Sequence, residues 1–105
     1  MLFRSLEGEP DPLAEFVELF LKDTPTRIAQ LNAALKKPDA NELESTAHSL
    51  KGSASNLGAQ SMAAICARLM HSARNSDFKA AGTLVKLVEE DFATIKCLLA
   101  EEVKR

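Results

Sequence analysis

The feature that most constrains the fold is the spacing of apolar residues, which recur every three or four positions along most of the chain. This spacing places apolar side chains on one face of an α-helix, and no alternating pattern of useful length indicates a β-strand. Glycine and proline occur only four times each, and most other residues are good helix formers. The sequence therefore predicts an all-α chain.

Turn signals divide the apolar pattern into four stripes. The helices expected from them span about 11–37, 40–57, 61–75 and 78–103. Pro25 lies within the first stripe, and Thr24 could be the N-cap of a separate helix there. The apolar residues keep one phase across the proline, however, which favours a single helix bent at Pro25. Asp39 and Glu42 resemble a capping box at the start of the second helix, and Gly58 predicts its end.

The stripes also predict which residues face the core. These are Leu13, Val17, Phe20, Thr24, Ile28, Leu31 and Leu35, then Leu43, Ala47, Leu50, Ala54 and Leu57, then Met62, Ile65, Cys66, Leu69 and Ala73, and finally Ala81, Val85, Val88, Phe92, Ile95 and Leu99. Four amphipathic helices joined by short turns can bury these faces only against one another. We expect an antiparallel up-down four-helix bundle, forming one domain over 1–105, with 1–10 as a lead-in or a short extra helix.

Composition limits the classes of function. Apolar residues make up 46% of the chain and charged residues 27%, and the net charge is −2. There is no basic excess to indicate nucleic acid, no apolar run long enough to cross a bilayer, and no secretory signal pattern. Cys66 and Cys97 lie in apolar helical patterns and are expected to be reduced core residues rather than a disulfide. A cytoplasmic protein is predicted, and nothing in the sequence requires more than a monomer.

His48 is predicted to lie on the exposed face of the second helix, because it falls about 160° around the helical wheel from Leu50. An exposed imidazole is mostly unprotonated at neutral pH and so offers a nucleophilic nitrogen. The neighbours on this face are polar or small. They are Glu44, Ser45, Lys51, Gly52 and Ser55.

Lys51 and Gly52 give this histidine a distinctive setting. Lys51 follows by three residues, so its ammonium can reach an anion attached to the imidazole. Gly52 follows by four and leaves the space above the imidazole open, although a glycine within a helix costs about 1 kcal/mol relative to alanine. Each residue alone is ordinary on a solvated surface, and Gly52 could instead permit close helix packing. Only the combination favours a functional histidine.

The segment AHSLKGSASNLGA, residues 47–59, closely resembles the signature of histidine-containing phosphotransfer (HPt) domains. The pattern is alanine, histidine, any residue, leucine, lysine, glycine and two small residues, with leucine-glycine nine and ten positions after the histidine. Every one of these positions is matched. The segments at 20–25 and 74–77, together with Cys66, also look like their counterparts in the family.

This resemblance implies a four-helix bundle in which His48 accepts a phosphoryl group. It implies that Lys51 helps to hold the phosphoryl oxygens and that Gly52 keeps the imidazole accessible. The partners it implies are receiver domains of response regulators or hybrid sensor histidine kinases, docked through apolar residues around His48. The receiver would supply the aspartate and the Mg²⁺, so this chain needs no cofactor of its own.

One position departs from the family. Several members carry a Gln or Glu on the following helix that hydrogen-bonds the imidazole or its phosphate, and the equivalent position here is Met70. His71 is adjacent but points about 100° away on the helical wheel. Arg74, one turn beyond Met70, could reach the phosphate edge as an arginine does in some members. Ser55 and Arg74 are therefore candidate supporting residues, and water could orient the imidazole.

The sequence is compatible with three functions. The histidines and cysteines lack metal-ligand spacing, and the sequence has no phosphate-binding loop or nucleotide-binding signature. We therefore expect a phosphoryl carrier without its own ATP site, acting as a phosphorelay intermediate. The alternatives are an adaptor bundle that binds receivers without being phosphorylated, which the intact motif disfavours, and the phosphoacceptor domain of a larger histidine kinase.

Overall fold

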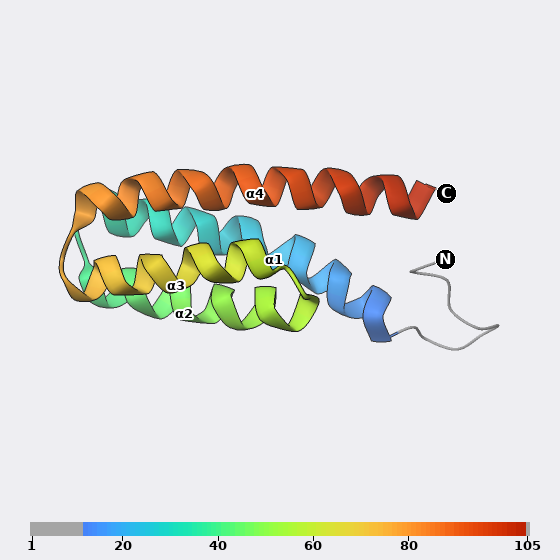
Figure 1. Ribbon diagram of the computed structural model, residues 1–105, viewed down its shortest axis with the longest axis horizontal. Helices are drawn as coiled ribbons and strands as arrows, with labels where there is room; N and C mark the ends of the chain where they lie inside the picture. The colour runs from blue at the N-terminus through green and yellow to red at the C-terminus, as the bar shows by residue number, and fades with distance from the viewer. Residues whose placement is uncertain (1–11, 105) are drawn as a thin grey trace.

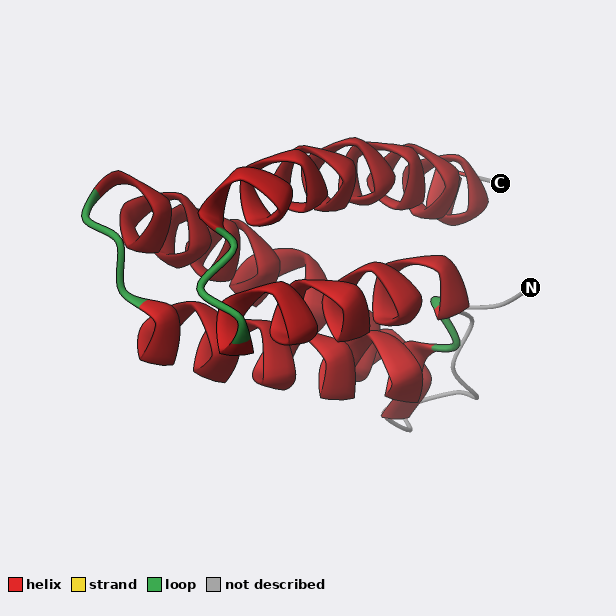
Figure 2. Cartoon of the chain, turned by 60° about the vertical axis from the view of Figure 1, so that its left-hand side comes forward, coloured by secondary structure: helices red, strands yellow, loops and turns green. Residues whose placement is uncertain are grey.

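The computed structural model describes residues 12–104, and their side chains as far as residue 99. Within this range the chain forms four helices joined by short turns (Figures 1 and 2). They are α1 (Pro12–Lys36), α2 (Ala40–Leu57), α3 (Gln60–Arg74) and α4 (Phe78–Lys104). The predicted all-α four-helix bundle is confirmed, and the predicted lead-in at 1–10 lies outside the described residues.

The helices pack in a ring in which each one contacts the helices before and after it. The α2–α3 pair has the most extensive contact, and no Cα atoms of the diagonal pairs lie within 8 Å of each other in the described residues. Figure 1 shows α2 and α3 lying side by side, with α1 and α4 extending past the turn that joins them. No helix in this part of the chain has the length and apolar character needed to span a membrane.

Pro25 lies inside α1, which continues through it as the sequence predicted. Thr24 is buried, and its hydroxyl donates to the carbonyl oxygen of Phe20 at 2.6 Å. This bond lies within the helix, so Thr24 does not act as the N-cap of a second helix. The single apolar face of α1 survives the proline because packing, rather than local propensity, stabilises most helices in proteins.

At the start of α2, one of the two hydrogen bonds of the predicted capping box forms. The Asp39 Oδ1 atom accepts a hydrogen bond from the backbone N–H of Glu42 at 3.1 Å. The reciprocal bond is absent, because the backbone N–H of Asp39 donates to the Ala34 carbonyl and the Glu42 carboxylate accepts from the Thr46 hydroxyl. Asp39 alone therefore caps this helix.

Gly58 ends α2 as predicted. Its φ of 85° lies in the left-handed region, where a Cβ is disfavoured. The next amide, that of Ala59, bonds back to the Ala54 carbonyl at 2.8 Å and closes the helix end. After α3, the Asp77 side chain accepts from the backbone N–H of Ala80 at 3.1 Å and caps α4.

The core is formed by residues from the predicted apolar stripe of every helix. Its fully buried members include Leu31, Leu43, Leu50, Met62, Leu69, Val85 and Val88. Leu13 is instead 39% exposed, because the end of α1 extends beyond α2 and α3. Six other predicted core residues are only half-buried: Ile28, Leu35, Leu57, Ile65, Ile95 and Leu99. The prediction for Cys97 is wrong, since this residue is exposed. It follows the inward-facing Ile95 by two positions, about 200° around the helix.

Candidate functional site

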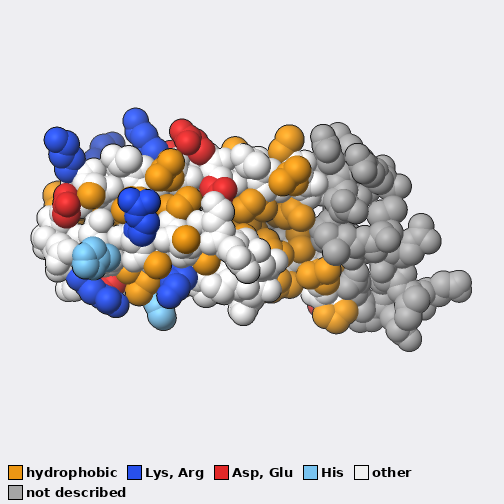
Figure 3. Space-filling view, in the orientation of Figure 1, with side chains coloured by type: hydrophobic (Ala, Val, Ile, Leu, Met, Phe, Trp, Pro, Cys, Tyr) orange, Lys and Arg blue, Asp and Glu red, His pale blue; other side chains and the backbone are white. Residues whose placement is uncertain are grey.

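His48 lies on the solvent-facing side of α2, where its side chain is exposed. The opposite side of α2 is anchored by Leu43, Ala47, Leu50 and Ala54, each with no exposed surface. This burial fixes the rotation of the helix and therefore the direction of the histidine. Figure 3 shows both histidines of the chain, as pale-blue side chains, on one face of the molecule.

Gly52 stands one turn after His48 and is also exposed. A Cβ placed on Gly52 would meet no neighbouring atom within 4 Å. The interpretation that Gly52 permits close helix packing is therefore wrong. Ser55 is small and exposed on the same face, so Lys51 is the only long side chain that α2 places beside Gly52 and Ser55 on this side of His48.

Lys51 is half-buried on α2. Its ammonium lies close enough to the Cys66 thiol on α3 to act on the pKa of that thiol. The pKa of Cys66 is raised to about 12, mainly by burial and in part by the Asp91 carboxylate, whereas Lys51 acts to lower it. Among the described residues no carboxylate pairs with Lys51 within ion-pair distance, so its charge is available to an anion on His48.

Arg74 approaches the His48 face from the end of α3. Its Nε donates to the Oε2 atom of Glu44, which lies one turn before His48 on α2. The Arg74 side chain is 60% exposed and that of Glu44 32% exposed. The structure therefore brings Arg74 to the edge of the predicted site, in contact with a carboxylate that the sequence had not identified as its partner.

Neither Met70 nor His71 hydrogen-bonds the His48 ring. Met70 is buried in the core. His71 is exposed, and its Nε2 lies 3.1 Å from the Asn75 side-chain nitrogen on the next turn of α3. No described residue hydrogen-bonds the His48 imidazole. The large exposed apolar side chains of the described residues lie on α1 and α4, so α2 itself contributes none to the apolar contact that the family resemblance implies.

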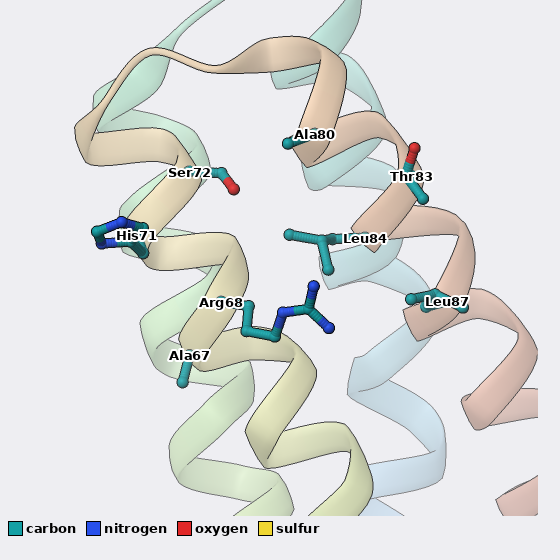
Figure 4. A pocket seen from close by; sticks show the side chains of 8 residues that line it. All are labelled: Ala67, Arg68, His71, Ser72, Ala80, Thr83, Leu84 and Leu87. Atoms are coloured by element: carbon teal, nitrogen blue, oxygen red, sulfur yellow. The ribbon is translucent and has the colours of Figure 1, made fainter.

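A separate groove of about 600 Å³ runs between α3 and α4. Figure 4 shows Arg68 reaching across it toward α4, whereas the His71 ring points away from it. His48 does not line this groove. The described residues also contain no group of three histidine, cysteine, aspartate or glutamate side chains able to hold a metal ion. The groove and the His48 face are therefore separate surfaces.

Comparison with known proteins agrees with the geometry. A family model for the Hpt domain matches residues 15–101. The chain belongs to the Hpt family. The prediction of an HPt domain is thereby confirmed.

A solved structure that this HPt domain resembles is histidine-containing phosphotransfer protein B (HptB) from Pseudomonas aeruginosa PAO1, with 37% sequence identity and a TM-score of 0.83. The match covers 87% of this chain and 79% of that chain. Histidine-containing phosphotransfer protein 5 from Arabidopsis thaliana is 38% identical over 63 residues, which cover 57% of this chain. The match spans 40% of the length of that curated relative. Both relatives are named as phosphotransfer proteins, and neither name describes a kinase.

Proposed function

We propose that this HPt domain is a phosphorelay intermediate, in which His48 accepts a phosphoryl group from a receiver-domain aspartate and passes it to another receiver domain. The observation that carries the proposal is the setting of His48. The imidazole is exposed, Gly52 leaves open space one turn away, and Lys51 presents a cation that no described carboxylate neutralises.

In the transfer step, an unprotonated ring nitrogen of His48 attacks the phosphorus of the aspartyl phosphate. The N–P bond forms as the O–P bond breaks, and the electron pair of the broken bond leaves on the aspartate carboxylate. The reverse step gives the phosphoryl group to the next receiver. Phosphoryl transfer depends mainly on in-line positioning and charge neutralisation, so an exposed nucleophile with one cation beside it is sufficient on this side of the interface.

Each remaining residue of the site has a defined part in this proposal. Lys51 neutralises negative charge on the phosphoryl oxygens, since it stands one turn from His48 on the same side of α2. Gly52 leaves room for the receiver to bring its aspartate in line with the imidazole. In this proposal the receiver supplies both the aspartate and the Mg²⁺.

The test is transfer from a receiver domain carrying labelled aspartyl phosphate, with acid-labile label on this chain as the readout. We expect label on the wild type, none on His48→Gln, and slower labelling of Lys51→Gln. His71→Gln is the matched control, because it removes the other exposed histidine and is expected to label like the wild type. Equal labelling of His48→Gln would place the phosphoryl group elsewhere. Receiver binding with no label on the wild type would make the chain an adaptor.

A further inference from the structure

Glu44 places a negative charge on the face that the phosphoryl group must occupy. It precedes His48 by four residues, and side chains at this spacing are neighbours on a helix, with about 5–6 Å between their Cβ atoms. A phosphoryl group carries a charge of roughly −1.5 to −2 at neutral pH. An unpaired carboxylate at this position would therefore oppose phosphorylation of His48.

Arg74 cancels that charge in the structure. Its guanidinium is bound to the Glu44 carboxylate, although the two residues are 30 positions apart in the chain. The pairing follows from the antiparallel packing of α2 and α3, which sets the end of α3 beside the beginning of α2. At this level of the bundle Arg74 lies opposite Glu44, one turn away from the level of His48.

We propose that Arg74 supports phosphorylation of His48 by neutralising Glu44, and not as a ligand of the phosphoryl oxygens. Arg74 is then a positioning residue that acts through a carboxylate. A move of Arg74 onto the phosphoryl group would leave Glu44 unpaired beside a dianion, so the gain of one contact would be offset by the loss of the other. This inference rests on the proposed role of His48 as the phosphoacceptor.

The test is a double-mutant cycle with Arg74→Gln, Glu44→Gln and the double variant. The readout is the equilibrium distribution of label between His48 and a phosphorylated receiver at low salt. We expect Arg74→Gln to lower the labelled fraction roughly two- to tenfold, which is the effect expected when one unpaired carboxylate repels a phosphoryl group one helical turn away. Glu44→Gln is expected to label at or above the wild-type level. The double variant is expected to return to within about twofold of the wild type, because both charges are gone.

Two outcomes would overturn the inference. A double variant that labels as poorly as Arg74→Gln would make Arg74 a direct phosphoryl ligand, because loss of Glu44 would not rescue it. Reduced labelling of Glu44→Gln would instead mean that the carboxylate itself is needed at the site.

Salt provides an independent readout that a purely structural role would not move. The defect of Arg74→Gln is expected to shrink between about 0.1 M and 1 M salt, since the screening length falls from about 10 Å to 3 Å. A defect that persists unchanged at high salt would contradict the charge explanation. If the wild type is not labelled, the proposed function itself fails. If the wild type is labelled through His48 but the rescue is absent, only the role of Arg74 fails.

Discussion

Gly52 offers a sharp separation between folding and function. It lies within α2, is exposed, and has open space where a side chain would project. Glycine within a helix costs roughly 0.5–1 kcal/mol relative to alanine, and no steric penalty opposes the replacement here. We therefore expect Gly52→Ala to raise the free energy of unfolding by about 0.5–1 kcal/mol. In a domain of this size that gain corresponds to a rise in Tm of roughly 2–8 °C.

The longer variant Gly52→Gln is expected to keep most of this stability, since glutamine is nearly as good a helix former as alanine. Its side chain, however, lies one turn from His48 on the same face and fills the space through which, in the proposed function, the receiver approaches. Misplacement of reacting groups by about 1 Å can slow a reaction on the order of a hundredfold. We expect transfer to Gly52→Gln to slow by about tenfold to a hundredfold while its Tm stays at or above that of the wild type.

The assay combines thermal or urea unfolding with the rate of label transfer from a phosphorylated receiver. Gly82→Ala is the matched control, because Gly82 also lies within a helix and a Cβ added there would likewise meet no neighbouring atom within 4 Å. It is expected to stabilise the protein without changing transfer. Two results would refute the reasoning: a Gly52→Gln variant that transfers at the wild-type rate, or one whose loss of stability accounts for its loss of transfer.

Two further predictions concern the core and a helix cap. The folded-state pKa of Cys66 is about 12 against an ordinary value of 9.0, so the folded protein keeps a proton that the unfolded chain releases. The associated stability is full below about pH 9 and is lost as the pH rises toward 12. In urea titrations over this range, the free energy of unfolding of the wild type should fall by up to about 1.4 kcal/mol per pH unit relative to that of Cys66→Ala. The same pH dependence in both proteins would contradict this. Asp39→Ala, which removes the side-chain cap of α2, is expected to lower the free energy of unfolding by about 1 kcal/mol without affecting the labelling of His48, and a variant as stable as the wild type would show that the cap is dispensable.

The fold was largely predictable because its determinants are local. Helical periodicity identifies the buried face of each helix, and short signals such as Asp39 and Gly58 mark where a helix begins or ends. The continuity of α1 through Pro25 was also predictable, since one apolar phase runs across the proline. The exposure of His48 followed from the same periodicity. Local patterns were therefore enough to place the proposed nucleophile on the surface.

The partners of the charged residues were not predictable, because they depend on how helices meet. Nothing in the sequence links Arg74 to Glu44, since the pair forms only when α2 and α3 pack with one particular register. The second bond of the capping box is absent for a similar reason. Asp39 and Glu42 have the right spacing, but the Asp39 amide bonds to the Ala34 carbonyl and the Glu42 carboxylate bonds to the Thr46 hydroxyl. Spacing shows which groups can interact, and packing decides which of them do.

The charge balance around His48 gives a reason why so few charged side chains surround it. A phosphoryl carrier must hold its group and then release it, so neither state can be strongly favoured. Lys51 contributes one cation, whereas the Glu44–Arg74 pair contributes close to no net charge. If the pair acts as proposed, an unpaired Glu44 would shift the equilibrium away from phosphohistidine, and a free Arg74 would shift it the other way. One net positive charge beside a group of charge near −2 leaves the phosphoryl only partly neutralised, which suits a group that has to leave in the next step.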